Sequence, residues 1–223
     1  MKNKIEILIP TYNEEKNIKN TINELRKNGY KNITVLDGKS NDKTVKIARD
    51  LGCRVIIDKK TKMGFGYSLK RGIFLSKKKY CCIFDADGSF NPNDINLLIK
   101  NIQKGADFIF ASRYLGGNKS DDDTFVTRLG NIFFTKLINI LFNYNISDAL
   151  FLFVLSETKK FKSLNLKEND FGICTEILIK AYRKYKCVEI FSKERKRRFG
   201  VSKVNKFSDG LKLFLNIFKN FLF

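Results

Sequence analysis

The stretch "YCCIFDADGSFNP" (Tyr80–Pro92) decides the fold, because a short apolar run ends there at two aspartates. A continuously apolar run of this length is typical of a strand that is buried on both faces of a sheet. Asn91 and Pro92 then predict the start of a helix, since proline is favoured at the first helical position. The two aspartates, Asp85 and Asp87, are therefore predicted to lie at the edge of a sheet, between a buried strand and a helix.

The same alternation of short apolar runs and helical patterns extends on both sides of this stretch. Five runs rich in Ile, Val and Phe are predicted as strands: Ile5–Pro10, Ile33–Asp37, Cys53–Ile57, Tyr80–Phe84 and Asp107–Ser112. Helical patterns lie between most of them, and this order predicts an α/β fold with a mostly parallel sheet flanked by helices. Ligands of such sheets bind beyond the carboxyl ends of the strands. At two of those ends, Asn13 and Ser40 are predicted to cap the helices that follow.

Charge and composition limit the possible classes of function. The chain has 43 Lys and Arg against 23 Asp and Glu, a net charge of +20. This excess favours a polyanionic partner such as phosphate esters, an anionic membrane or nucleic acid, unless it reflects only a coding bias towards lysine. The absence of histidine excludes His-dependent triads and His-ligated metal sites. Five cysteines without a CxxC pair predict reduced core residues in a cytosolic protein.

Two apolar segments in the second half predict contact with a membrane surface. Residues 131–142 and 211–223 are mostly apolar with spaced lysines or asparagines, as in helices that lie in the plane of a bilayer surface. The alternative is an ordinary core helix and a frayed tail. No run of about 20 apolar residues occurs, so no complete membrane span is expected.

Asp85 and Asp87 are candidate metal ligands. Side chains two residues apart in an extended segment point the same way, so the two carboxylates can converge on one site. Like charges at that distance repel unless a proton or a cation joins them. Mg²⁺ or Mn²⁺, completed by water and substrate phosphates, is the natural partner. Two solvated loop aspartates are the alternative explanation of this spacing.

Eight motifs in a fixed order carry a resemblance to a known family. They are "ILIPTYNEEKNI", "VLDGKSNDKT", "KMGFGYSLKRG", "FDADGSFNPND", "GADFIFASRYLGG", "RLGNIFF", "FGICTEILIKAYRK" and "RFGVSK". In this order they resemble the family 2 inverting glycosyltransferases of GT-A fold, and within them the dolichyl- or polyprenyl-phosphate sugar transferases. The resemblance implies a Rossmann-like GT-A domain over residues 1–205, with a nucleotide-sugar-binding half (1–112) and an acceptor-side half (113–205). An amphipathic, interfacial helix is expected over residues 206–223.

The resemblance implies that particular residues bind the donor and a metal ion. The segment that holds the nucleotide base and ribose matches Pro10, Tyr12, Glu14 and Asp37. The DxD pair matches Asp85 and Asp87, with Asp87 expected on the metal and Asp85 on the metal and the nucleotide or sugar side. Ser89 stands where mannosyl members often have glutamine, and it is the third candidate metal ligand.

The resemblance also implies how the acceptor and the diphosphate are held. Arg113 and Arg128 match arginines that grip a lipid phosphate, and Ser202 and Lys203 match a basic loop that closes over the diphosphate. The residues expected to act in catalysis are Asp85, Asp87, Arg113, Arg128 and Lys203. The chain departs from the family after Asp148, where many members read "SGFR" and this sequence reads "ALFLFV".

The implied reaction is metal-dependent transfer of a hexose, with inversion, from a UDP- or GDP-sugar to a polyprenyl or dolichyl phosphate, with a lean towards UDP-hexose. The metal at Asp87 and cations such as Lys203 or Arg198 would stabilise charge on the leaving diphosphate. A lipid phosphate is already an anion and needs no general base, although a carboxylate such as Glu176 or Asp148 is left open as one.

Two alternatives are an enzyme of the same fold acting on a hydroxyl of a soluble sugar or glycan, and a basic nucleic-acid-binding protein. The second alternative is disfavoured, because the sequence has no recognition helix, zinc pattern or aromatic ribonucleoprotein motif. We therefore expect no nucleic-acid partner. The expected location is the cytoplasm, peripherally on the cytosolic face of an anionic membrane. The sequence gives no indication of oligomeric state.

Overall fold

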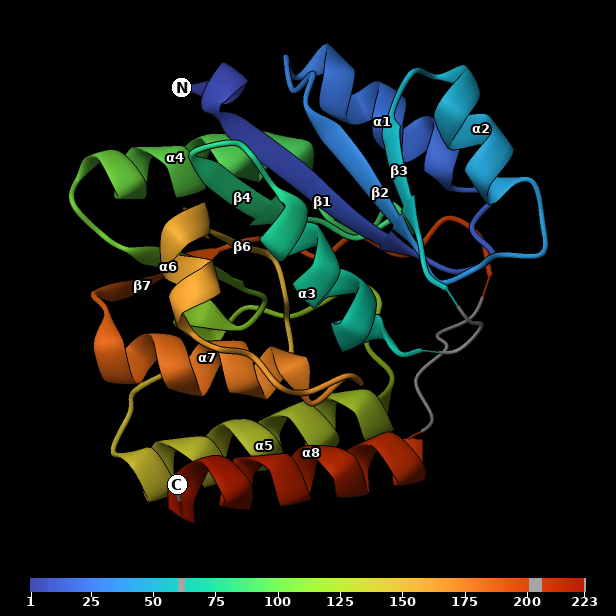
Figure 1. The fold of residues 1–223 in the computed structure, drawn as a ribbon. Helices are drawn as coiled ribbons and strands as arrows, with labels where there is room; N and C mark the ends of the chain where they lie inside the picture. Colours follow the sequence, from blue (N-terminus) through green and yellow to red (C-terminus); the bar gives the residue numbers. More distant parts are fainter. Residues whose placement is uncertain (60–62, 201–205, 223) are drawn as a thin grey trace.

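The computed structural model describes residues 1–59, 63–200 and 206–222, and its centre is one seven-stranded sheet (Figure 1). The strands are β1 (Ile5–Thr11), β2 (Ile33–Asp37), β3 (Arg54–Ile57), β4 (Tyr80–Ile83), β5 (Phe108–Ser112), β6 (Val154–Glu157) and β7 (Cys187–Phe191). All five strands predicted from apolar runs are present, with no end shifted by more than one residue. Their order across the sheet is β3-β2-β1-β4-β6-β5-β7.

The sheet is mostly parallel, as predicted, with β6 as the antiparallel exception. Every pair that excludes β6 is parallel. β6 lies between β4 and β5 and runs antiparallel to both, so Leu155 pairs with Cys82 on one side and Ile109 on the other. The predicted α/β class is confirmed, with the sheet more precisely described as mixed.

Helices cover both faces of the sheet and divide the core into two layers. They are α1 (Ile18–Lys27), α2 (Thr44–Asp50), α3 (Phe65–Leu75), α4 (Ile95–Gln103), α5 (Phe125–Phe142), α6 (Thr158–Ser163), α7 (Ile173–Lys184) and α8 (Lys206–Leu222). One layer includes Ile22 of α1 and Leu98 of α4, and the other includes Leu69 of α3 and Ile177 of α7. Burial on both faces explains why the strands are apolar without alternation.

The quoted stretch folds as the sequence predicts. Pro92 opens a short 3₁₀ turn (Pro92–Asp94), and the side chain of Asn91 caps it by accepting a hydrogen bond from the backbone N–H of Asn93 (3.1 Å). α4 follows immediately. The strand, the acidic loop and the helix start therefore place Asp85 and its neighbours at the carboxyl edge of the sheet.

The predicted helix caps at Asn13 and Ser40 are wrong, because α1 and α2 begin four residues or more after them. These side chains instead join the loops after β1 and β2. The Asn13 backbone N–H donates to Ser40 Oγ (2.8 Å), and Asn13 Oδ1 accepts from the backbone N–H of Asn41 (2.9 Å). The two loops are thus fixed to each other beside the carboxyl end of the sheet.

α5 and α8 lie side by side along one edge of the molecule, away from the sheet (Figure 1). α5 contains the predicted apolar segment 131–142 and begins before it, whereas α8 begins at Lys206, where the interfacial helix was expected to begin. α5 is 18 residues long and apolar enough to cross a membrane by length and composition, a test that core helices of soluble proteins also pass. One side of it is buried through Phe134 and Ile138, so in this fold α5 packs along the protein.

Candidate active site

Two adjoining cavities lie at the carboxyl edge of the sheet, where the sequence predicts the ligand. The larger, here called the polar cavity, has a volume of about 460 Å³ and many charged residues in its wall. The smaller, here called the apolar cavity, has a volume of about 190 Å³ and is walled mainly by Phe and Leu side chains. Residues common to both are Pro10, Phe65, Asp85 and Phe171. Asp85 is therefore the charged group at their junction.

The DxD carboxylates lie just after β4, on the wall of the polar cavity. Asp87 Oδ1 accepts a hydrogen bond from the backbone N–H of Ser89 (2.9 Å), and Oδ2 forms an ion pair with Nη2 of Arg197 (3.1 Å). Asp85 Oδ1 accepts from the backbone N–H of Ala86 (2.7 Å). Burial, together with the nearby charge of Asp87, raises the pKa of Asp85 to about 8. The pair thus holds a repulsion that a bound cation would relieve.

Asp85 and Asp87 fit a hard divalent cation. Mg²⁺ and Mn²⁺ are commonly held by one or two carboxylates and completed by water and substrate phosphates. Within the described ranges, no group of three or more His, Cys, Asp or Glu residues could hold a metal by itself. The remaining ligands would therefore come from substrate and water. The prediction of Ser89 as a third ligand is not met, because this buried residue lines neither cavity and supports Asp87 through its backbone N–H.

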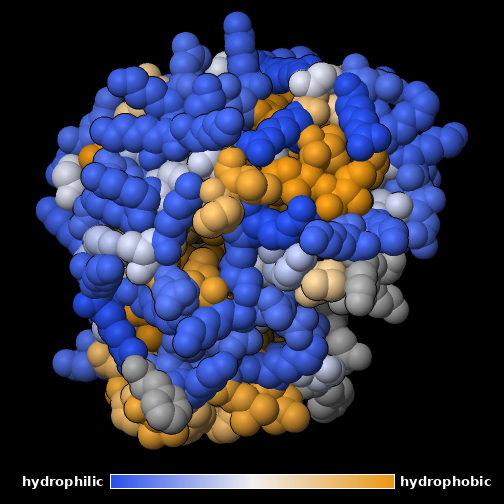
Figure 2. Space-filling model, viewed as in Figure 1, coloured by the Kyte–Doolittle hydropathy of each residue, from blue (hydrophilic) through white to orange (hydrophobic). Residues whose placement is uncertain are grey.

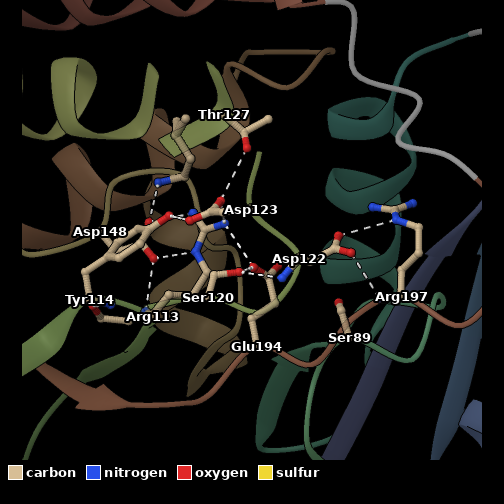
Figure 3. Close-up of polar contacts among 12 residues, drawn as sticks. Ser89, Arg113, Tyr114, Ser120, Asp122, Asp123, Thr127, Asp148, Glu194 and Arg197 are labelled. Carbon is tan, nitrogen blue, oxygen red and sulfur yellow. Dashed lines mark hydrogen bonds and ion pairs between the residues drawn. The ribbon is translucent and has the colours of Figure 1, made fainter. Parts of the chain in front are cut away.

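Arg197 is a site residue that the sequence analysis missed. Its guanidinium forms ion pairs with two carboxylates, Asp87 at 3.1 Å and Asp122 at 3.5 Å. Figure 3 shows the contact with Asp122. Arg197 also lines the polar cavity. The expected cation was its neighbour Arg198, whose side chain instead pairs with Glu24 on α1. The run "ERKRRFG" indicates a basic loop. Because a loop has no regular repeat, the sequence does not show which of two adjacent arginines faces the site.

The residues predicted to hold the nucleotide are brought partly together. Pro10, Tyr12 and Glu14 line the polar cavity. Asp37 is fully buried and does not line it. Its carboxylate accepts hydrogen bonds from the backbone N–H and the hydroxyl of Ser40 (2.8 and 2.6 Å). Asp37 therefore orders the loop after β2, and direct contact between Asp37 and a donor stays a prediction.

Arg113 is held in a buried cluster of carboxylates (Figure 3). Nε and Nη2 donate to the two oxygens of Asp148 (2.7 and 2.9 Å), and Nη1 lies 3.3 Å from Glu194 Oε2 and 4.0 Å from Asp123 Oδ1. These carboxylates raise the pKa of Arg113 despite its burial. Its guanidinium also lies over the ring of Phe151. Three of its N–H groups are thus engaged within the protein, and Arg113 joins three loops of the second half. Arg113 also lines the apolar cavity, and its contact with a lipid phosphate stays a prediction.

The other predicted acceptor residues lie elsewhere. Arg128 is exposed on the first turns of α5 and lines neither cavity. Its role on a lipid phosphate stays a prediction, and the structure does not bring it into the Arg113 cluster. Ser202 and Lys203, predicted to close over the diphosphate, lie outside the described residues.

Both carboxylates left open as a general base have structural partners. Asp148 is buried and holds Arg113. Glu176 is buried and accepts hydrogen bonds from the backbone N–H groups of Lys167 and Glu168, while its Oε1 pairs with Lys180 at 2.6 Å. Neither lines a cavity. A base role for Asp148 or Glu176 is therefore not accommodated by this geometry.

Comparison with known proteins agrees with this fold. The profile of glycosyl transferase family 2 matches residues 6–164. The chain belongs to glycosyltransferase family 2. It is 34% identical over 190 residues to an uncharacterized protein of Methanocaldococcus jannaschii, covering 81% of this chain and 76% of that protein. It is 28% identical over 201 residues to the UDP-N-acetylglucosamine–dolichyl-phosphate N-acetylglucosaminyltransferase of Methanococcus voltae, covering 78% of each chain.

A solved structure shows the shared GT-A-like fold of this glycosyltransferase. Glucosyl-3-phosphoglycerate synthase from Mycobacterium tuberculosis, in complex with Mn²⁺, UDP-glucose and phosphoglyceric acid, aligns with a TM-score of 0.78. The alignment covers 97% of this chain and 79% of that one, at 17% sequence identity. At this sequence identity the similarity shows only that the sheet and its helices are arranged alike. It gives no information about the substrates of this chain.

Proposed function

We propose that this glycosyltransferase moves a hexose from a nucleotide-sugar to a polyprenyl phosphate, with inversion, at a membrane surface. The observation that carries the proposal is the position of Asp85 between a polar cavity and an apolar cavity. A nucleotide diphosphate matches the first cavity in size and polarity, since small-molecule sites commonly measure about 300–1,000 Å³. The second suits the first carbons of a lipid. The reacting sugar carbon would lie where the two meet.

On the donor side, Asp85 and Asp87 would hold the divalent cation. When bound, such an ion supplies positive charge that stabilises the leaving diphosphate. Arg197 would stabilise the diphosphate from beside the cation. Its planar guanidinium faces Asp87 and can pair with phosphate oxygens through two N–H groups. Asp122 holds the other side of Arg197 and so fixes its direction.

On the acceptor side, the chain needs to orient an anion and exclude water. A phosphate monoester is already ionised at pH 7, so attack on the sugar carbon requires positioning and no proton removal. The engagement of Asp148 and Glu176 in other contacts is in keeping with a reaction that uses no base. The departure "ALFLFV" contributes Leu150, Phe151 and Leu152 to the apolar cavity, which favours a lipid over a soluble, hydroxyl-rich acceptor.

The surface formed by α5 and α8 supports a location on a bilayer. Figure 2 shows apolar atoms gathered along the edge where these helices run. Large exposed apolar residues of this face, here called the α5/α8 face, are Phe125, Val126, Leu129, Ile132, Phe133, Ile140, Leu211, Phe214, Leu215, Phe221 and Leu222. Monomeric soluble proteins rarely expose so continuous a patch.

α8 carries apolar side chains on both of its sides. Leu213 and Ile217 are buried against the protein, together with Asn216 and Asn220, while Leu211 and Leu215 are about 60% exposed. A bilayer surface is an environment in which these outward leucines are favourable, because it removes them from water. With a net charge of +20, we place the enzyme on the anionic cytosolic leaflet of a membrane.

The relative from Methanococcus voltae, which is named for transfer to dolichyl phosphate, adds support for the acceptor class. The test is a panel of UDP- and GDP-sugars with Mn²⁺ or Mg²⁺, assayed with and without polyprenyl phosphate. We expect chloroform-extractable sugar only when the lipid phosphate is present. Equal turnover with a soluble hydroxyl acceptor would replace the proposal with the alternative reaction of the same fold.

A further inference from the structure

Few cations lie in the part of the polar cavity's wall that the structure describes. They are Arg197 and Lys212. The carboxylates of this wall are Glu14, Asp85, Asp87, Asp170 and Asp209. A divalent ion bound by the DxD pair would balance two of these five charges. Among the described residues of the wall, Arg197 and Lys212 are then the cations that can turn towards a bound diphosphate.

Lys212 belongs to α8, the helix whose outer side forms part of the α5/α8 face. Its Nζ lies 2.8 Å from Asp170 Oδ2 and 3.8 Å from Asp209 Oδ1, and the side chain is about half exposed. Both partner carboxylates also line the polar cavity. A lysine on a flexible stem can exchange such solvated partners for a phosphate at little cost.

α8 is held firmly enough to act as a wall of the site. Asn216 Oδ1 accepts a hydrogen bond from Thr175 Oγ1 on α7 (3.1 Å), and Lys219 pairs with Glu168 at 3.4 Å. The residue after Lys212 is Leu213, which is buried and lines the apolar cavity. Consecutive residues of one helix thus face the two cavities.

We propose that Lys212 binds the phosphates of the nucleotide-sugar opposite Arg197, so that the membrane-facing helix supplies a donor-binding residue. This inference rests on the proposed function, since it assumes a nucleoside diphosphate in the polar cavity. The amphipathic tail is then part of the donor site as well as a surface for lipid. Because one helix serves both, donor binding and bilayer binding share a structural element.

The test is direct binding of UDP and of GDP to the full chain in the presence of Mn²⁺, measured by calorimetry without acceptor. Lys212→Met should lower the affinity for the tighter-binding nucleotide by about tenfold or more, because one charge-assisted hydrogen bond contributes about that much. Lys212→Arg should bind within about threefold of the unmodified protein, because a cation remains. Lys219→Met is the matched control: it removes an ion-paired lysine of the same helix that lines neither cavity.

The outcomes separate the inference from the proposed function. Weak binding by Lys212→Met, with unchanged binding by Lys219→Met and unchanged melting temperatures, supports the assignment. Unchanged binding by Lys212→Met overturns it, as does an equal loss in Lys219→Met, which would reflect the seating of the helix. If Lys212→Met fails to fold, Lys212→Gln takes its place under the same criteria. An unmodified chain that binds neither nucleotide would overturn the proposed function itself.

Discussion

Replacing Arg113 with methionine tests whether this arginine is a structural cation or a ligand for the acceptor phosphate. Its side chain is 11% exposed, and that of its main partner Asp148 is fully buried. Methionine keeps most of the apolar contact with Phe151 and removes the charge together with the hydrogen bonds to Asp148 and Glu194. The substitution leaves Asp148 and Glu194 as buried carboxylates without their cation.

The expected cost is large. Removing one member of a buried ion pair costs about 3–5 kcal/mol, because the partner charge is left uncompensated. The free energy of unfolding of globular proteins is only about 5–15 kcal/mol, so Arg113→Met should lose about a fifth or more of the stability. Combining Arg113→Met with Asp148→Leu should recover part of the loss, since the strongest unpaired charge is then removed as well.

Urea denaturation of the two variants and the unmodified protein measures these free energies of unfolding. Lys46→Met is the control, because the Lys46–Asp50 pair is 73% and 61% exposed and such pairs contribute about 1 kcal/mol or less. If Arg113→Met changes the unfolding free energy no more than this control does, the structural interpretation fails. A raised KM for lipid phosphate with unchanged stability would support the predicted contact of Arg113 with the acceptor phosphate.

Two further predictions concern Asp85 and the α5/α8 face. Because the pKa of Asp85 is raised to about 8, the folded chain keeps a proton that the unfolded chain releases above its ordinary carboxyl pKa. The unfolding free energy should therefore fall as pH rises towards 8. In EDTA, the melting temperature of Asp85→Asn should exceed that of the unmodified protein by a margin that grows from pH 5 to pH 8. A margin that does not change with pH would contradict the raised pKa. In a sedimentation assay, Leu215→Glu should weaken binding to phosphatidylserine-containing vesicles by about tenfold or more. Leu97→Glu changes an exposed leucine of α4 and should leave vesicle binding unchanged. Equal loss of binding in both variants would contradict a specific role of the α5/α8 face.

The sheet was predictable because burial on both faces leaves a direct mark on the sequence. Runs such as Ile33–Asp37 can be read as strands without knowledge of their neighbours. The direction of β6 was not predictable, because the apolar run that contains it carries no information about parallel or antiparallel pairing. The caps at Asn13 and Ser40 were misplaced for a related reason. Their hydrogen bonds cross between loops 27 and 28 residues apart, whereas a cap is a local pattern.

The candidate site was predictable at the level of motifs and not of contacts. The DxD pair was placed correctly at the strand end from the apolar run before it and the helix start after it. The pairing of Arg113 with Asp148 and Glu194 joins residues 35 and 81 positions apart, which no local pattern encodes. The choice of Arg197 over Arg198 depends on the direction of a loop. Lys212 lay in a segment interpreted only as a lipid-facing tail, because its inward side is defined by α7.

The most direct test of the central claim is the effect of Mn²⁺ on UDP and GDP binding when Asp87 is removed. We expect Mn²⁺ to strengthen binding of the preferred nucleotide to the unmodified chain, and Asp87→Ala to abolish that gain. Asp122→Ala is the control, because Asp122 also pairs with Arg197 but lines neither cavity; the gain should persist in this variant. An undiminished Mn²⁺ effect in Asp87→Ala would contradict the account, since the two carboxylates after β4 would then not share a cation with the donor.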